Sequence, residues 1–458
     1  MRALLILLIV FGSLPFILAR PYVGVVVWSW ISYMNPHRLV WWSFVYTMPI
    51  AAIVGGTTLL AYAISAEPKR IPLNRVTVVW MLFAVWMCVT TVFALNEPGA
   101  YQGWDRDFKI QIMALVALAM LTNRQRLDML VWMIVMSIGF YGVKGGLFAI
   151  RTGGHYLLWG PPDSFIEGNN ELALAMLVIM PLMRYLQLQT KNRWIRYGLA
   201  LAMGLSAIAV LTSYSRGALL AACAIAVFLW WKSRHRTALG VGMLAIAIAG
   251  LAFMPHQWFD RMSTIDTYQS DASAMGRINA WHFAVNLALD HPITGGGFNT
   301  FTRALFARYA PNPTDFHDAH SIYFQVLGEH GFVGLALFLL LALFAWRTGT
   351  RVIRQARDRA DLRWAQDLAA MIQVSLVGYA VGGTFLGLAY FDLPYNLIGI
   401  LVATRVLVDR RITEGANVEA ESWLEALRPV PFRRRRPGHG PEKGPRAIAS
   451  ARAEGERQ

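Results

Sequence analysis

The sequence is poor in cysteine, with only Cys88 and Cys223 among its 458 residues. Both lie inside long apolar runs, so we expect each to be a small buried side chain. Two isolated cysteines exclude a disulfide framework, and they also exclude the paired spacing of a structural zinc site. Small secreted or zinc-stabilised folds are therefore excluded.

Acidic residues are also scarce: Asp and Glu number 27 against 42 Lys and Arg, which gives a formal net charge of +15. In a soluble protein this excess would suggest nucleic-acid binding. Here the positive residues collect in alternate loops and in the C-terminal tail, which is typical of membrane topology signals. We therefore expect membrane lipids, and no nucleic acid, as partners of these charges.

Two further patterns are missing. No internal repeat recurs at a fixed period. The three consecutive glycines at 295–297 are not followed by Gly-Lys-Ser/Thr, so they do not form a Walker A loop. They are expected instead to set a tight turn between helices of a loop.

Long apolar runs dominate the chain, and 56% of its residues are hydrophobic. Runs of about 20 residues recur from Leu4 to Leu407, each long enough to cross a hydrocarbon layer of ~30 Å. The sequence therefore predicts an all-α polytopic membrane protein with about twelve transmembrane helices, if 3–34 crosses once. The expected spans are 3–34 (interrupted at Pro15 and Pro21), 42–64, 76–95, 108–122, 127–150, 170–189, 196–214, 217–232, 237–254, 321–346, 366–387 and 393–408.

The basic clusters fall on one side of this arrangement, which is the cytoplasmic side by the positive-inside rule. The N-terminus imitates a signal peptide but lacks an A-x-A cleavage site, so we interpret it as an uncleaved first span. An even number of spans then places both termini in the cytoplasm. The clusters are Lys69/Arg70/Arg75, Arg124/Arg126, Lys191/Arg193/Arg196, Lys232/Arg234/Arg236 and Arg347 through Arg363.

Four regions follow: helices in 1–254, a long loop at 255–320 on the opposite side, helices in 321–411, and a tail at 412–458. The loop is rich in aromatic residues, and its apolar spacing predicts an amphipathic helix at about 275–290. The tail cannot bury a core and is predicted to be disordered. Its run Arg433–Arg436 either anchors the topology or touches anionic lipid.

His320 lies where the long loop meets the next span, close after Asp315, His317 and Asp318. A neutral imidazole at this boundary can take a proton from a sugar hydroxyl. One alternative is a metal site, although the spacing matches no strong ligand motif. The other is a polar helix start that Asp318 caps.

Arg216 and Arg277 lie on the side away from the basic clusters, against the positive-inside bias. Arginine forms bidentate hydrogen bonds to phosphate oxygens, so these two residues suit a lipid-linked diphosphate. The alternative is contact with lipid headgroups. Lys144 and Arg106, predicted near outer span ends, could extend the basic surface or equally contact headgroups.

Glu329 follows His320 by nine positions, so it lies about 13 Å deeper if the segment is helical, at ~1.5 Å per residue. A carboxylate at that depth is costly and often functional. The alternative is a structural hydrogen bond to a neighbouring span.

Four segments carry a resemblance to a known family. They are SRGALLA at 215–221, GRINAW at 276–281, HPITGGGF at 291–298 and HSIYFQVLGEHGFVG at 320–334. In this order they resemble the O-antigen ligase/polymerase family of bacterial membrane glycosyltransferases. The N-terminal segments YVGVVVWSWISYMNPHRL and GVKGGLF are similar to its O-glycosylation ligase subgroup.

The resemblance implies a GT-C-class fold in the bacterial inner membrane, with one long periplasmic loop and a periplasmic active site. It implies an undecaprenyl-diphosphate-linked glycan as donor and the lipid A–core oligosaccharide as acceptor. The family histidine corresponds to His320 as catalytic residue, and the family arginines correspond to Arg216 and Arg277 at the donor diphosphate. Glu329, His317, Asp318, Lys144 and Arg106 could support them. Inverting transfer without a metal or other cofactor is also implied.

Other functions stay open on the sequence. An O-antigen polymerase transfers the same donor to a repeat-unit glycan, and a protein O-oligosaccharyltransferase transfers it to a protein hydroxyl. A polysaccharide transporter is a different class. Transporters usually show repeated halves and midplane polar groups at interrupted helices, whereas the polar residues here crowd one outer loop.

Overall fold

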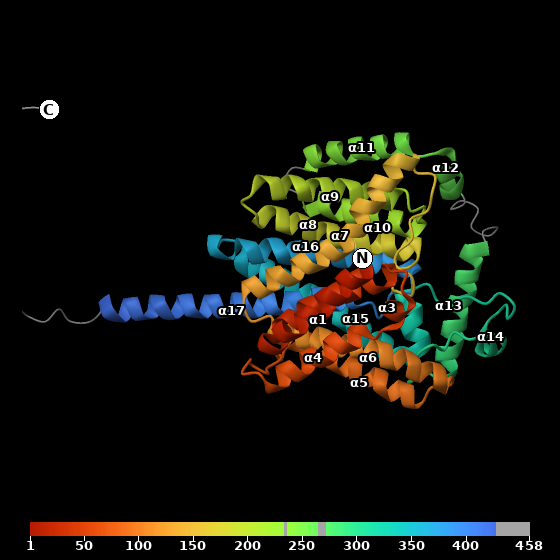
Figure 1. Ribbon diagram of the computed structural model, residues 1–458, viewed down its shortest axis with the longest axis horizontal. Helices are drawn as coiled ribbons and strands as arrows, with labels where there is room; N and C mark the ends of the chain where they lie inside the picture. The colour runs from red at the N-terminus through yellow and green to blue at the C-terminus, as the bar shows by residue number, and fades with distance from the viewer. Residues whose placement is uncertain (233–235, 264–271, 427–458) are drawn as a thin grey trace, which may run out of the picture. The chain divides into compact units, whose positions relative to one another are not determined.

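The structure, a computed structural model, describes residues 1–232, 236–263 and 272–426. Met1–Arg411 form one compact unit and Ile412–Gln458 a second. Within the described ranges the chain is entirely helical, with no strand (Figure 1). Its helices are α1 Arg2–Ala19, α2 Pro21–Met34, α3 Ser43–Thr47, α4 Ile50–Ile64, α5 Arg75–Val92, α6 Glu97–Met120, α7 Arg124–Thr152, α8 Asn169–Gln189, α9 Arg193–Leu211, α10 Arg216–Lys232, α11 Arg236–Phe253, α12 His256–Ser263, α13 Ala272–Asp290, α14 Arg303–Tyr309, α15 Ile322–Ala356, α16 Arg363–Gly382 and α17 Asp392–Ala426, with short 3-10 turns at Pro36–Leu39, Ala360–Leu362 and Gly383–Phe385.

Among the described residues, seven helical segments are long and apolar enough to cross a membrane. They are Arg2–Ala19, Arg75–Val92, Arg124–Thr152, Asn169–Gln189, Arg193–Leu211, Ile322–Ala356 and Ala360–Phe385, and α4 is apolar but shorter. The all-helical character is thus confirmed, and these helices are compatible with a multi-pass membrane protein. They do not reproduce the expected count of twelve.

Three long helices begin with an asparagine directly before an arginine. The side chains of Asn74, Asn123 and Asn192 accept hydrogen bonds from backbone N–H groups at the starts of α5, α7 and α9. Such caps satisfy donors that the first helical turn leaves unpaired. The three starts coincide with basic clusters, and Arg126 donates to Glu67 at 2.8 Å across that end.

Segment 3–34 is two helices rather than one interrupted span. α1 continues through Pro15, so the interruption expected there is wrong: one proline removes only one backbone hydrogen bond from an apolar helix. α1 ends at Arg20, whose backbone is extended, and Pro21 opens α2. Proline suits this first position because its missing N–H would have no partner there anyway.

The direction of α1 differs from the expected single crossing. Tyr22, at the start of α2, donates a hydrogen bond to the carbonyl of Arg126, and the guanidinium lies 5.2 Å from its ring centroid. The junction of α1 and α2 therefore lies at the basic end of the bundle. The N-terminus lies farther toward the opposite end (Figure 1), which disagrees with an N-terminus beside the basic clusters.

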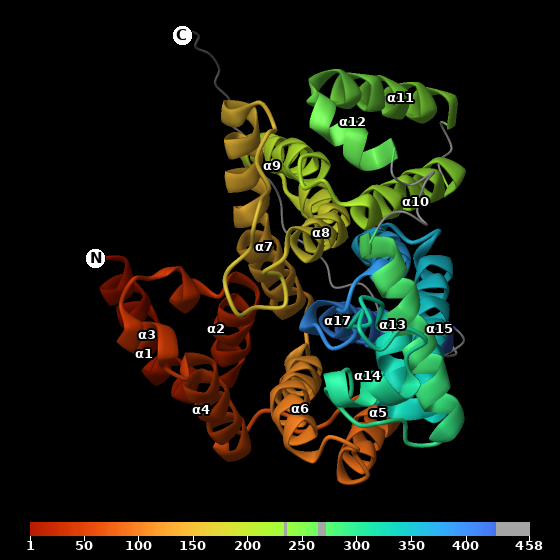
Figure 2. The same cartoon turned by 90° about the vertical axis from the view of Figure 1, so that its right-hand side faces the viewer.

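The long loop is folded. α12, α13 and α14 lie at one end of the long helices, where Figure 2 views them face-on. α13 contains the helix expected at about 275–290. Its buried Phe283 stacks on Phe306 of α14 with ring centroids 4.4 Å apart, so α13 and α14 share an aromatic core. Residues 264–271 of this loop lie outside the described residues.

α15 is broken at Gly331, where the backbone turns to φ 67° and ψ −170°. The carbonyls of Gly328 and Glu329 accept hydrogen bonds from the N–H groups of Gly296 and Gly297, both at 2.8 Å. The glycine run therefore forms a turn, as expected. Its N–H groups also bond the carbonyls that the break in α15 leaves without helical partners. We call residues 295–297 together with 328–331 the glycine clasp.

Two smaller expectations differ from the structure. Cys88 is half-buried and Cys223 is exposed, so the expectation of buried cysteines is wrong for Cys223, whose side chain points away from the rest of the bundle. α17 continues to Ala426, so 412–426 of the tail is helical rather than disordered. The remainder, with Arg433–Arg436, lies outside the described residues.

Candidate active site

His320 stands at the entrance to α15, directly before the N-cap residue Ser321. Its backbone is left-handed, with φ 41°, a conformation that costs a non-glycine residue free energy unless the surroundings impose it. Trp281 of α13 supplies such a restraint. Its indole N–H donates to the carbonyl of Ala319 at 2.9 Å, and its ring stacks on Phe324 at 4.9 Å.

Burial is the main cause that lowers the pKa of the half-buried His320 imidazole, because the charged form loses water. The positive charge of Arg277 lowers it further, and His317 acts in the same direction. Asp318 opposes them with its negative charge. The net pKa is below the ordinary value, so His320 is neutral near pH 7 and can accept a proton.

Arg277 lies near the start of α13, within electrostatic reach of both His320 and Glu171 of α8. The preceding residue is Gly276, and a Cβ atom there would lie 2.3 Å from the ring of His317. Only glycine fits this contact. It brings the loop before His320 against α13, so the structure places Arg277 and His320 together.

Arg216 opens α10 after a sharp turn in which Tyr214 has a left-handed φ of 58°. The Ser215 hydroxyl caps the helix by accepting from the N–H of Ala218 at 3.1 Å. The side-chain amide of Asn169 donates to the carbonyl of Ser213 at 2.7 Å, which ties this turn to the start of α8. A helix N-terminus favours anions, and Arg216 adds a full positive charge there.

The start of α10, directly after the turn at Tyr214, and helix α13 contact the same aromatic group. A Cβ atom at Gly217 would lie 3.3 Å from the side chain of Phe385, and the Phe385 ring is 6.3 Å from Trp281. Since Trp281 also holds the backbone beside His320, α13 and the starts of α10 and α15 adjoin one aromatic group. Arg277 lies beside His320 there, and Arg216 opens the helix whose second residue contacts Phe385.

The expected supporting residues separate into two groups. His317 lies 2.9 Å from a carboxylate oxygen of Asp315, and Asp318 is exposed beside His320. Lys144 is exposed on α7, which packs mainly on α9, α2 and α8.

Among the described residues, no three His, Cys, Asp or Glu side chains are grouped so that they could hold a metal ion.

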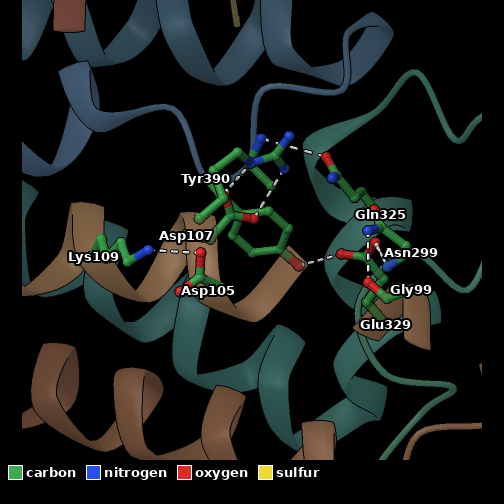
Figure 3. Close-up of polar contacts among 10 residues, drawn as sticks. Gly99, Asp105, Asp107, Lys109, Asn299, Gln325, Glu329 and Tyr390 are labelled. Carbon is green, nitrogen blue, oxygen red and sulfur yellow. Dashed lines mark hydrogen bonds and ion pairs between the residues drawn. The ribbon is translucent and has the colours of Figure 1, made fainter. Parts of the chain in front are cut away.

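Arg106 and Glu329 belong to a second polar cluster, of which Figure 3 labels Asp107, Glu329 and Tyr390. The guanidinium of Arg106 pairs with fully buried Asp107 at 2.7 Å and covers the ring of Phe165 at 4.8 Å. Arg106 lies within electrostatic reach of Glu329 and Tyr390. The structure therefore brings Arg106 to Glu329 rather than to His320.

Both carboxylate oxygens of Glu329 are occupied. The Tyr390 hydroxyl donates to Oε2 at 2.6 Å, and the backbone N–H of Asn299 donates to Oε1 at 2.9 Å (Figure 3). Sequence reasoning missed Tyr390 and Asn299. Asn299 follows the glycine run with a left-handed φ of 51°, a conformation that asparagine tolerates, but nothing local indicates its partner.

Two family models match the chain. One, described as O-antigen ligase, covers residues 201–339, and the other, a family of unknown function named DUF5935, covers residues 1–191. No curated protein matches the chain. The first match includes Arg216, Arg277 and His320 together with the glycine clasp. The match over residues 201–339 supports the resemblance of this part of the chain to the O-antigen ligase family.

Proposed function

We propose that this protein is an O-antigen ligase of the bacterial inner membrane with a GT-C-class fold. It transfers a glycan from undecaprenyl diphosphate to the lipid A–core oligosaccharide on the periplasmic side. The observation that carries the proposal is that His320 lies beside Arg277, with the start of α10, which holds Arg216, adjoining the same aromatic pair of Trp281 and Phe385. One neutral imidazole beside two arginines suits proton removal next to a diphosphate.

The two arginines hold the donor diphosphate in this proposal. Each guanidinium can form two parallel hydrogen bonds to phosphate oxygens, and neither loses its charge at physiological pH. The N-terminus of α10 adds a partial positive charge at Arg216. These charges stabilise the diphosphate more strongly as it leaves, when its negative charge grows, and that difference accelerates the transfer.

His320 acts as the general base. The imidazole takes the proton of the acceptor hydroxyl while the hydroxyl oxygen bonds to the anomeric carbon from the face opposite the diphosphate. The bond between the anomeric carbon and the phosphate oxygen breaks, and its electron pair leaves with undecaprenyl diphosphate. One bond forms and one breaks, the configuration inverts, and no metal or other cofactor is required.

The basic ends of α5, α7 and α9 face the cytoplasm in this proposal, by the positive-inside rule. α13, α14 and the start of α15 lie at the opposite end of the bundle, which then faces the periplasm. The donor diphosphate would sit at headgroup level there, beside the arginines. ATP is not needed, because cleavage of the donor's glycosyl–phosphate bond drives the transfer.

Transfer by the purified protein tests the proposal. The protein in detergent or nanodiscs would be mixed with an undecaprenyl-diphosphate-linked glycan and, separately, with lipid A–core, a repeat-unit acceptor and a peptide. We expect transfer to lipid A–core that excess EDTA leaves unchanged. Transfer only to the repeat unit would identify a polymerase instead of a ligase. Transfer only to the peptide would identify a protein O-oligosaccharyltransferase. No transfer to any acceptor would refute the proposed function.

A further inference from the structure

α13 and the first part of α15 run side by side in the same direction. Midway along α13, Trp281 contacts Ala319 and Phe324 at the start of α15, as described above. Farther along, a Cβ atom at Gly328 would lie 3.4 Å from the Cβ of Ala284. Arg277 and His320 therefore stand at one end of this helix pair, and the glycine clasp closes the other end.

The break at Gly331 separates residues 322–330 from the rest of α15. Beyond the break, the N–H of Phe332 donates to the carbonyl of Pro292 at 2.9 Å, so the turn after α13 replaces the helix's own hydrogen bonds. A Cβ atom at Gly295 would lie 2.5 Å from the N of Gly331, so the two backbones meet without side chains between them. The clasp therefore fixes the join between residues 322–330 and the rest of α15.

Glu329 links the clasp to two other parts of the chain. Through Tyr390 it binds the segment before α17, and through the N–H of Asn299 it binds the segment after the glycines. Asn299 in turn donates to the carbonyl of Gly99 at 2.8 Å (Figure 3). Its own carbonyl accepts from Asn96 at 3.1 Å, so both contacts are with the start of α6. Glu329 is only 3% exposed, so water does not substitute for these bonds.

His330 anchors the same point to α5. Its Nδ1 lies 2.7 Å from the hydroxyl of Thr90, and its carbonyl accepts from the indole N–H of Trp86 at 3.0 Å. Residues 322–330 are thus held at their C-terminal end by α5, α6 and the segment before α17. Their N-terminal end, about 13 Å away at ~1.5 Å per residue, lies beside His320, where Trp281 also holds Ala319 and Phe324.

We infer that Glu329 is a positioning residue: by locking the glycine clasp through Tyr390 and Asn299, it sets the spacing between Arg277 and His320 at the opposite end of the helix pair. This inference rests on the proposed function of that site. Glu329 is not placed to act as the base in this proposal, because it lies at the clasp end of the helix pair, away from Arg277 and His320, with both oxygens in hydrogen bonds to Tyr390 and Asn299. A small rotation at the clasp is enlarged along a lever of about 13 Å, at ~1.5 Å per residue.

Substitutions that remove these bonds in steps test the inference. Glu329→Ala removes both hydrogen bonds, Tyr390→Phe removes one, and Glu329→Gln can keep both contacts while removing the ionisable carboxyl group. A misplacement of ~1 Å far from the reacting atoms can lower the rate about 100-fold. We expect kcat to fall about that much in Glu329→Ala and less in Tyr390→Phe, with KM for the donor little changed. Glu329→Gln should stay within a few-fold of wild type.

The control is Glu97→Ala, which removes an exposed carboxylate at the start of α6 near Asn96 but outside the clasp. It should transfer at the wild-type rate. Tyr390→Phe keeps the test decisive if Glu329→Ala does not fold, because it deletes a single hydroxyl and no carbon atom. Wild-type kcat in folded Tyr390→Phe and in Glu329→Ala would overturn the inference.

A pH profile distinguishes positioning from a loss of folded protein. The charged groups that face His320 are Arg277 from α13 and His317 and Asp318 from its own loop, and Glu171 of α8 faces Arg277. If the clasp loosens, Arg277 moves away and the acid limb of kcat/KM shifts up toward the ordinary histidine value of ~6.5. If a variant only yields less folded protein, its kcat/KM keeps the acid limb of the wild type.

Three outcomes overturn the inference. An acid limb that stays in place in Glu329→Ala while kcat falls would show that the spacing to Arg277 does not depend on Glu329. Glu329→Gln as damaged as Glu329→Ala would show that the carboxyl group itself is needed, rather than its contacts with Tyr390 and Asn299. A wild-type protein that transfers nothing would refute the proposed function, and this inference with it.

Discussion

The imidazole of His320 combines three features that a general base needs. It is half-buried, its backbone is held by the contact between Trp281 and Ala319, and a cation lies nearby in Arg277. Burial and Arg277 favour the neutral form over the imidazolium. A base of this kind is ready to accept a proton near pH 7 and contributes about 10²–10⁴-fold to a rate.

The pH dependence of transfer follows from the lowered pKa of His320. The base works when neutral, so activity is lost as the pH falls through that pKa. Because the pKa lies below the ordinary value of ~6.5, the acid limb should lie below pH 6.5 as well. Asp318→Asn removes a negative charge that raises the pKa, so it should move the limb to still lower pH. A limb above 6.5 in the wild type would contradict this environment.

The arginines are tested by substitutions that keep the charge. Arg216→Lys and Arg277→Lys lose the planar fork that binds two phosphate oxygens, so transfer should fall at least tenfold in each. Arg151→Lys, at an exposed position near the end of α7, is the matched control and should be unaffected. Transfer at the wild-type rate by both site variants would leave the arginines as contacts to lipid headgroups.

The local sequence predicted the three candidate site residues, but it did not predict the residues that hold Glu329 in place. His320, Arg216 and Arg277 stand out because polar and basic residues interrupt apolar surroundings on the side away from the basic clusters. Tyr390 and Asn299 give no such signal, because their roles depend on contacts with Glu329 from distant parts of the chain. Such long-range pairings cannot be read from spacing.

At the scale of elements, the aromatic core between α13 and α14 supports the site. Phe306 is fully buried against Phe283. Phe306→Ala should remove about 3–5 kcal/mol of stability from this unit. Limited proteolysis should then cut within 272–320 faster than in wild type. The matched control is Phe259→Ala, at a position 42% exposed, and equal cleavage of the two variants would mean that no such core holds the unit together.

Helix positions were largely predictable from apolar runs, and helix breaks were not. α13 follows from apolar residues at helical spacing, and the long helices follow from their length and hydrophobicity. Pro15 does not end α1, whereas Gly331, inside an otherwise helical pattern, breaks α15. The difference lies in tertiary contacts: the glycines at 295–297 satisfy the carbonyls that the break leaves free.

At the scale of the whole molecule, the orientation is tested by cysteine labelling. Thr314 and Ala360 are exposed at opposite ends of the proposed topology, before α15 and after it. In a background with Cys88→Ala and Cys223→Ala, we expect Thr314→Cys to react with an impermeant thiol reagent in intact spheroplasts. Ala360→Cys should react only after permeabilisation. Equal labelling of both in intact spheroplasts would reject the topology.

Transfer by His320→Ala tests the central claim most directly. The measurement is the rate of glycan transfer from the undecaprenyl-diphosphate-linked donor by purified protein, with donor binding measured separately. His282→Ala, which removes an exposed histidine of α13, is the control. We predict that His320→Ala still binds donor but transfers at least 100-fold more slowly, while His282→Ala is unchanged and His317→Ala is affected mildly. Transfer at the wild-type rate by a His320→Ala protein that binds donor would contradict the assignment of His320 as the base.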